Sequence, residues 1–183
     1  MPRIKTLDKA EGKAKELLDN VQKKLGATPN IFKTLAHAPA ALEGFLNFSG
    51  ALATGKLSPA LREQVALTVA GLNNCDYCAS AHTVIGKKAG VADKELSSAV
   101  AGKSADAKTQ AALSFVAAIV KKQGHIATAE LDAVRKAGYS EGEVVELVAL
   151  TALNIFTNYF NHVAETEVDF LPKIETKKLA SAA

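Results

Sequence analysis

Apolar side chains recur every three or four positions along most of this chain, whereas strict alternation, the pattern of a half-buried strand, is weak. Glycine and proline separate the periodic stretches at the places where helices end or begin. Ser58 followed by Pro59, for example, suits a helix N-cap and first position, and Gly26 suits a helix stop. We therefore predict a single all-α domain, a helical bundle over 1–183. The predicted helices cover about 8–25, 30–35, 39–54, 58–71, 74–90, 93–100, 106–123, 128–137 and 140–170.

A weak internal repeat is superimposed on this pattern. A shift of 80 positions aligns Glu63 with Glu143, Asn74 with Asn154 and His82 with His162. The alignment predicts two copies of a helix-hinge-helix unit, at 57–90 and 138–170. An N-terminal helix within 1–27 precedes them, and 173–183 is expected to be a frayed tail.

Composition sets limits on location and partners. Hydrophobic residues make up 48% of the 183 positions, but aromatic residues only 5%, so the core must be mostly Ala, Leu and Val. Such small side chains suit closely packed helices and a homo-oligomer. The 22 basic and 19 acidic groups are interspersed, which indicates a solvated surface and no nucleic-acid partner. No apolar run of roughly 20 residues is present and the N-terminus is polar, so we expect a cytoplasmic protein without a membrane partner.

The two cysteines of the chain, Cys75 and Cys78, stand two residues apart, and His82 follows one helical turn later. In a reducing compartment, a lone pair at this spacing is more typical of redox chemistry or metal binding than of a structural disulfide. A zinc site would need a fourth ligand beyond the cysteines and His82, and there is no second cysteine pair. Redox chemistry is the favoured interpretation; a structural disulfide, inert thiols and zinc stay open as alternatives.

Helix geometry gives this pair a mechanism. If Asn74 caps the helix, Cys75 occupies its first position and Cys78 lies one turn in, so both sulfurs share one face. Free N–H groups and the positive dipole end at a helix start favour the thiolate. His82, four residues after Cys78, can take the thiol proton directly or through a water, and a carboxylate behind it would fix the imidazole. Glu63 is the carboxylate that we select.

Each of these residues also has a plainer interpretation. Glu63 can be a surface glutamate, and His82 a helix-face histidine bonded to a backbone carbonyl. Glu143 lies three residues after Ser140, the spacing of a capping box, so its match in the repeat can reflect helix initiation alone. For His162 we favour a buried histidine with amide partners over a second polar site.

Together, Glu63, Cys75, Cys78 and His82 form an E-x11-C-x2-C-x3-H motif. This motif resembles the signature of the alkyl hydroperoxidase D-like (AhpD-like) proteins of the carboxymuconolactone decarboxylase superfamily. The resemblance implies an all-helical fold that assembles as trimers or hexamers. It also implies that Cys78 attacks the peroxide, that Cys75 resolves the intermediate, and that His82 with Glu63 relays the proton. Tyr77 departs from those members that carry histidine between the cysteines; it can be packing or a hydroxyl donor near the sulfurs.

The function implied by the resemblance is thiol-dependent reduction of hydrogen peroxide or alkyl hydroperoxides. The expected partners are the peroxide and a thiol-donor protein, with an external dithiol of the dihydrolipoyl type as reductant. We expect no bound cofactor and no metal, and the sequence contains no G-x-G-x-x-G segment for direct use of NADH. Two other functions stay open: a carboxymuconolactone decarboxylase-type enzyme, and a non-enzymatic redox sensor or disulfide-exchange protein.

Overall fold

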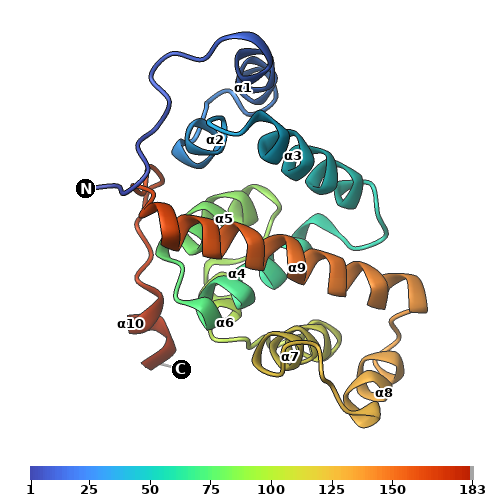
Figure 1. Cartoon of the computed structure of the whole chain (residues 1–183). Helices are drawn as coiled ribbons and strands as arrows, with labels where there is room; N and C mark the ends of the chain where they lie inside the picture. The colour runs from blue at the N-terminus through green and yellow to red at the C-terminus, as the bar shows by residue number, and fades with distance from the viewer. Residues whose placement is uncertain (182–183) are drawn as a thin grey trace.

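The computed structural model describes residues 1–181, and all regular structure within them is α-helical, as predicted (Figure 1). The helices of this part are α1 (Gly12–Leu25), α2 (Asn30–Leu35), α3 (Pro39–Ala53), α4 (Pro59–Asn73), α5 (Asp76–Lys88), α6 (Asp93–Val100), α7 (Ala107–Lys121), α8 (Thr128–Lys136), α9 (Glu141–Ala164) and α10 (Thr176–Ser181). No helix in the described range combines the length and the apolar character needed to cross a membrane.

Helix α4 forms the centre of the bundle and packs against α5, α6, α7 and α9. Figure 1 shows α9 crossing the molecule beside α4, with α1 to α3 on one side and α7 and α8 on the other. Most of α4 is buried, and Val65, Leu67 and Val69 are completely inaccessible. Burial of this apolar surface is the main force that holds the bundle together.

Local sequence signals explain the boundaries of several helices. Ser58 Oγ accepts the Leu61 N–H at 3.2 Å, with Pro59 at the first position of α4. Gly26 ends α1 in the left-handed conformation, at φ 74°. Both signals were recognised from the sequence.

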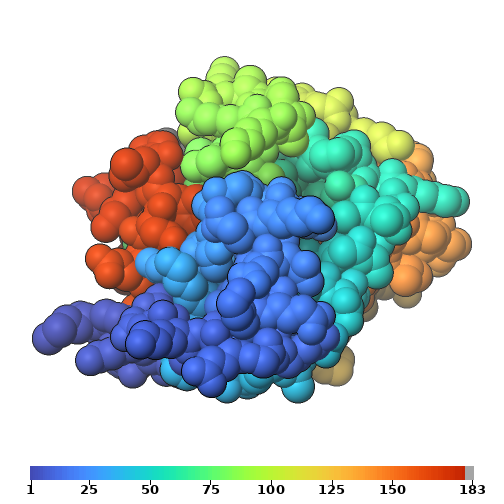
Figure 2. Space-filling model, turned by 90° about the horizontal axis from the view of Figure 1, so that it is seen from above, coloured from blue at the N-terminus to red at the C-terminus, as the bar shows by residue number. Residues whose placement is uncertain are grey.

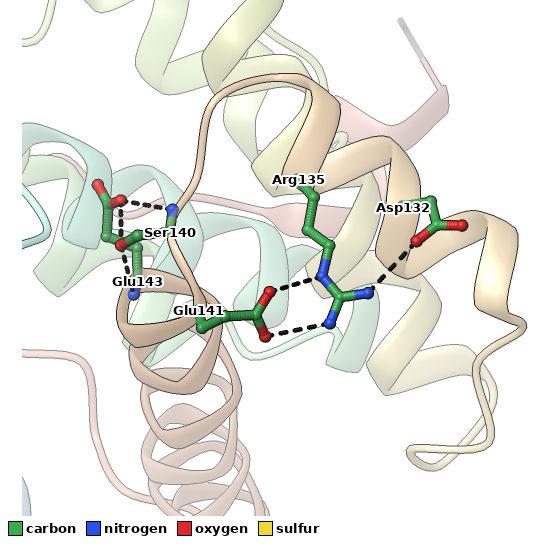
Figure 3. Close-up of polar contacts among 5 residues, drawn as sticks. All are labelled: Asp132, Arg135, Ser140, Glu141 and Glu143. Atoms are coloured by element: carbon green, nitrogen blue, oxygen red, sulfur yellow. Dashed lines mark hydrogen bonds and ion pairs between the residues drawn. The ribbon is translucent and has the colours of Figure 1, made fainter.

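The start of α9 is a reciprocal capping box (Figure 3). The Ser140 hydroxyl accepts the Glu143 N–H at 3.3 Å, and the Glu143 carboxylate accepts the Ser140 N–H at 2.8 Å. Arg135 at the end of α8 donates two hydrogen bonds to the Glu141 carboxylate, at 2.7 and 3.1 Å, and thus ties α8 to α9. Glu143 is therefore a helix-starting residue, as the capping-box interpretation predicted.

Contacts far apart in sequence correct two helix ends. The helix predicted over 140–170 stops at Ala164, because Glu165 adopts the left-handed conformation and Asp169 instead accepts the Asn30 N–H at 2.8 Å, at the start of α2. The first helix starts at Gly12 rather than near position 8, because the preceding segment is extended and donates backbone hydrogen bonds to α9 and α2. Figure 2 shows this N-terminal segment and α3 across one face of the molecule.

The predicted repeat and the predicted tail also need correction. Asn74 breaks the chain between α4 and α5, but Asn154, its partner in the repeat, lies inside the continuous helix α9. The second unit at 138–170 is thus not a helix-hinge-helix. Within 173–183, the segment Thr176–Ser181 forms α10, and buried Thr176 donates to Asp76 through its N–H and hydroxyl; positions 182–183 lie outside the described residues.

Candidate active site

A two-residue turn, Asn74 and Cys75, connects α4 to α5 and places both cysteines. Asn74 adopts the left-handed conformation, φ 56°, and ends α4. The prediction that it caps α5 is therefore wrong. Asparagine tolerates this conformation better than most residues. Cys75 is the N-cap instead, and its N–H donates to the Ala70 carbonyl at 2.8 Å. The turn therefore fixes Cys75 at the helix start and puts Cys78 in the first turn.

Cys75 and Cys78 are joined in a disulfide, with their Cα atoms 5.4 Å apart. Cys75 Sγ also accepts the Cys78 N–H at 3.3 Å. The two residues are 1% and 3% exposed, so the sulfurs lie in the core at the positive end of α5. The position at the helix start favours an ionised sulfur once the disulfide is reduced, whereas burial opposes it.

His82 and Glu63 meet across the α4–α5 interface. Nδ1 of His82 lies 2.7 Å from Glu63 Oε2, and the two side chains are 24% and 16% exposed. With the carboxylate ionised, Nδ1 carries the proton and Nε2 is the nitrogen that can accept one. The structure thus brings together two of the predicted site residues. Within residues 1–181, however, the groups that donate hydrogen bonds to the sulfurs are the Asn161 amide and the Cys78 N–H. His82 donates to neither sulfur.

The Glu63–His82 pair lines a cavity of about 200 Å³ between α3, α4, α5 and α9. Its walls are mainly apolar, with a few polar side chains among them. The lining residues are Phe45, Ser49, Leu52, Ala53, Arg62, Glu63, Ala66, His82, Leu150, Leu153, Asn154 and Thr157. Such a space, apolar with a few convergent polar groups, is typical of a small-molecule site.

Asn161 is a site residue that the sequence reasoning missed. It lies near the end of α9, 4% exposed, and its Nδ2 donates to Cys78 Sγ at 3.2 Å. The signal available in the sequence was the spacing of Asn154, Asn158 and Asn161, which puts three amides on one face of an otherwise apolar helix. All three are buried.

The structure favours the packing interpretation of Tyr77 and overturns the one favoured for His162. Tyr77 points away from the sulfurs: its hydroxyl accepts the Ile31 N–H at 3.1 Å, and its ring packs edge-on against Phe170. Burial raises the pKa of this phenol well above its usual value, so it is not a proton carrier at neutral pH. His162 was predicted to be buried, but it is exposed, and its Nε2 lies 3.3 Å from the Asn74 carbonyl oxygen. Among residues 1–181, no three His, Cys, Asp or Glu side chains cluster closely enough to hold a metal ion.

Comparison with known proteins agrees with the family resemblance. Residues 39–122 match the model of the carboxymuconolactone decarboxylase family. A search of curated proteins found no match. Over this part of the chain, the match agrees with the superfamily that the motif had predicted.

Solved structures share the fold at low sequence identity. A peroxidase-related protein with an alkylhydroperoxidase AhpD core, from Ralstonia eutropha JMP134, is 23% identical over 92% of each chain, with a TM-score of 0.82. A peroxidase-related protein from Silicibacter sp. TM1040 is 20% identical over 93% of this chain and 96% of the other, with a TM-score of 0.80. The debrominase Bmp8, in complex with 2,3,4-tribromopyrrole, is 18% identical over 98% of this chain and 96% of its own, with a TM-score of 0.77. These similarities confirm the AhpD-like helical fold.

Proposed function

We propose, from the match of residues 39–122 to the carboxymuconolactone decarboxylase family model and from the geometry of the site, that this chain is a thiol-dependent peroxidase. It reduces hydrogen peroxide or alkyl hydroperoxides through a Cys75/Cys78 dithiol–disulfide cycle, with Glu63 and His82 as proton relay. The observation that carries the proposal is the placement of a Cys75–Cys78 disulfide at the start of α5, four residues before a histidine that lies 2.7 Å from the partly buried Glu63 carboxylate.

The cycle begins with the reduced protein. His82 Nε2 takes the proton of Cys78, directly or through a water, and Glu63 stabilises the imidazolium through Nδ1–H. The Cys78 thiolate attacks the terminal peroxide oxygen; the O–O bond breaks, and the alkoxide leaves as an alcohol with the proton from His82. Cys78 is then a sulfenic acid.

The resolving step uses Cys75. Its sulfur attacks the Cys78 sulfenic acid, the S–S bond forms, and the hydroxyl leaves as water. The Cα separation of 5.4 Å is within the range that a disulfide spans, so no backbone movement is needed. An external dithiol of the dihydrolipoyl type, carried by a thiol-donor protein, then reduces the disulfide and is itself oxidised.

The cavity beside Glu63 and His82 suggests where the substrate binds. Phe45, Leu52 and Leu153 provide apolar walls that suit the alkyl part of a hydroperoxide. Its volume of about 200 Å³ suits a short chain rather than a lipid. No bound cofactor and no metal enter this mechanism. A cytoplasmic location stays part of the proposal, because the pair must be kept reducible.

A substrate panel with purified protein and excess dithiol tests the proposal. We expect continuous consumption of small hydroperoxides, lost in a variant with both cysteines replaced by serine. Lactone decarboxylation that survives this double replacement would establish the decarboxylase instead. A brominated pyrrole belongs in the panel because Bmp8 shares the fold; debromination without peroxide turnover would replace the peroxidase assignment.

A further inference from the structure

One hydrogen bond near the disulfide has no role in the cycle described above. Asn161 Nδ2 donates to Cys78 Sγ at 3.2 Å across 83 positions of sequence, and both residues are buried. A disulfide sulfur is a weak acceptor, whereas a thiolate is a charged one that forms much stronger hydrogen bonds. The amide is therefore suited to the reduced, ionised form of Cys78.

Stability alone does not explain this asparagine. Its Oδ1 is buried without a hydrogen-bond partner, and so is Nδ2 of Asn158, one turn earlier. A buried polar atom without a partner destabilises the folded protein, and an apolar side chain of similar size would avoid that cost. Asn161 thus has a polar group where packing would favour leucine, and its N–H points at a sulfur that becomes charged when the disulfide is reduced.

A second cavity, of about 300 Å³, adjoins the disulfide on the side of Cys75. Cys75 and Asn161 line it together with Asp76 and the exposed His162 and Glu165, but Cys78 does not. It shares no lining residue with the Glu63–His82 cavity. The molecule therefore offers separate approaches to the relay pair and to the Cys75 end of the disulfide.

We propose that Asn161 is a positioning residue that holds Cys78 as the thiolate, and that an external dithiol reduces the protein by attacking Cys75 through this second cavity. The inference rests on the dithiol–disulfide cycle of the proposed function, but it concerns only the reductive half. It assigns the incoming sulfur to Cys75 and the released sulfur to Cys78.

The reduction proceeds in two balanced steps. A donor thiolate forms a bond to Cys75 Sγ, the Cys75–Cys78 bond breaks, and its electron pair goes to Cys78, which becomes a thiolate that accepts the Asn161 N–H. The second donor thiol, deprotonated, then attacks the donor sulfur of the mixed disulfide. The donor becomes a disulfide, and Cys75 leaves with the electron pair and takes a proton. The donor loses two electrons and the protein gains them.

Other groups near the sulfurs also contribute to the charge of Cys78. The charged or titratable side chains that line the two cavities are Arg62 and Glu63 on α4, Asp76, Tyr77 and His82 on α5, His162 on α9, and Glu165 beyond it. All of them stay in place when Asn161 alone is changed, so a single substitution isolates the amide.

The first test locates the attacked sulfur in the unmodified protein, without peroxide. Oxidised protein is treated with glutathione, the freed thiol is trapped with iodoacetamide, and the peptide with both cysteines is sequenced by mass spectrometry. We expect glutathione on Cys75 and the carbamidomethyl group on Cys78. The reverse labelling would overturn the inference. This test uses no peroxide, so its result is independent of the peroxidase assay. If the labelling is reversed but the protein turns over peroxide, only this inference is wrong. If the labelling is as expected but the protein does not turn over peroxide, only the peroxidase assignment is wrong.

The second test compares Asn161→Leu with Asn158→Leu, a matched control whose amide bonds Asn73 rather than a sulfur. Thiolate absorbance gives the Cys78 pKa in a Cys75→Ser background, and equilibration with glutathione gives the potential of the disulfide. We expect Asn161→Leu to raise the pKa of Cys78, because the thiolate loses its hydrogen-bond donor. For the same reason, the equilibrium constant for exchange with glutathione should shift about tenfold toward the disulfide. Equal shifts in both variants would contradict the assignment. Should Asn161→Leu not fold, the isosteric Asn161→Asp takes its place, and its carboxylate should raise the Cys78 pKa further.

Discussion

The two sulfurs occupy different surroundings although they are three residues apart. Cys75 Sγ accepts a backbone N–H of its own helix, whereas Cys78 Sγ accepts a side-chain amide from α9 and has His82 one turn away on α5. A histidine base and an amide donor both favour the thiolate. This asymmetry is the basis for giving the two cysteines different roles.

The asymmetry predicts an order of reactivity. In the reduced protein at neutral pH, Cys78 should react with an alkylating agent much faster than Cys75, because only Cys78 has His82 at i+4. Mass spectrometry of partially labelled protein measures this directly. Cys78→Ser should abolish peroxide turnover, whereas Cys75→Ser should permit one oxidation to a trapped sulfenic acid. If Cys75 is labelled first, the roles are reversed.

Replacement of Glu63 tests the proton relay. Glu63→Gln keeps the side-chain shape but cannot stabilise the imidazolium of His82, so it should raise the Cys78 pKa and slow turnover by about 10²- to 10⁴-fold. Steady-state rates and thiolate absorbance report the two effects. A rate within twofold of wild type would remove Glu63 from the relay.

Glu143→Gln is the control for Glu63→Gln. Glu143 caps α9, and hydrogen bonds from the Ser140 side chain and backbone lower the pKa of its carboxyl below the ordinary value of 4.5. The substitution should cost about 1 kcal/mol of stability and leave the thiol unaffected. Because the folded-state pKa is depressed, this stability difference should be present above pH 4.5 and disappear as the pH falls through the lower value. Denaturant unfolding at several pH values measures it.

The sequence predicted one part of this site and missed another. Glu63, Cys75, Cys78 and His82 lie on consecutive packed helices, so their spacing alone predicted the Glu63–His82 pairing that the structure contains. The Asn161 contact depends on how α9 crosses α5, and local periodicity holds no information on that crossing.

At the scale of elements, the close packing of α4 depends on one glycine. A Cβ added at Gly71 would lie 1.9 Å from the Val100 carbonyl oxygen, at the end of α6. A backbone atom cannot move aside as a flexible side chain can. Gly71 therefore permits α6 to approach α4 at the end of the helix that precedes the cysteine turn.

Gly71→Ala should destabilise the protein by about 1–3 kcal/mol or more, because the added methyl group overpacks the α4–α6 contact. Gly44→Ala provides the matched control: Gly44 lies inside α3 with nothing within 4 Å of the added Cβ, so it should stabilise by about 0.5–1 kcal/mol through helix propensity. Urea unfolding compares them. Similar changes in both variants would contradict the packing argument.

Helix positions were predictable and several helix ends were not. Periodicity and caps such as Ser58 placed α2, α4 and α6 almost to the residue. The end of α9 at Ala164 depends on Asp169 and the N-terminal segment, which pair with distant elements. Those tertiary contacts override an apolar pattern that continues through Phe170.

At the scale of the whole molecule, the outer face of α9 is apolar as well as the inner one. Side chains at three- or four-residue spacing are exposed along it, namely Val145, Val148, Ala152, Phe156, Tyr159 and Val163. On the inner face of the same helix, Leu147, Leu150 and Leu153 are buried in the core. An exposed stripe of this length is typical of a protein interface.

We expect a homo-oligomer, a trimer or hexamer, in which this stripe contacts a second copy. Phe156→Glu should shift the assembly toward the monomer, because it places a charge among apolar side chains. Light scattering at micromolar concentration measures the mass of both proteins. A wild-type mass of 19.1 kDa, that of a single chain, would show a monomer and contradict the expected homo-oligomer.

The most direct test of the central claim counts how many peroxide molecules one chain reduces. Reduced protein is mixed with excess hydroperoxide, first alone and then with excess dihydrolipoamide, and peroxide loss is followed over time. The dithiol cycle predicts one equivalent consumed per chain without the dithiol, and many equivalents with it. Cys78→Ser should consume none. Consumption that stops at one equivalent even with the dithiol present would identify a redox sensor and contradict the peroxidase.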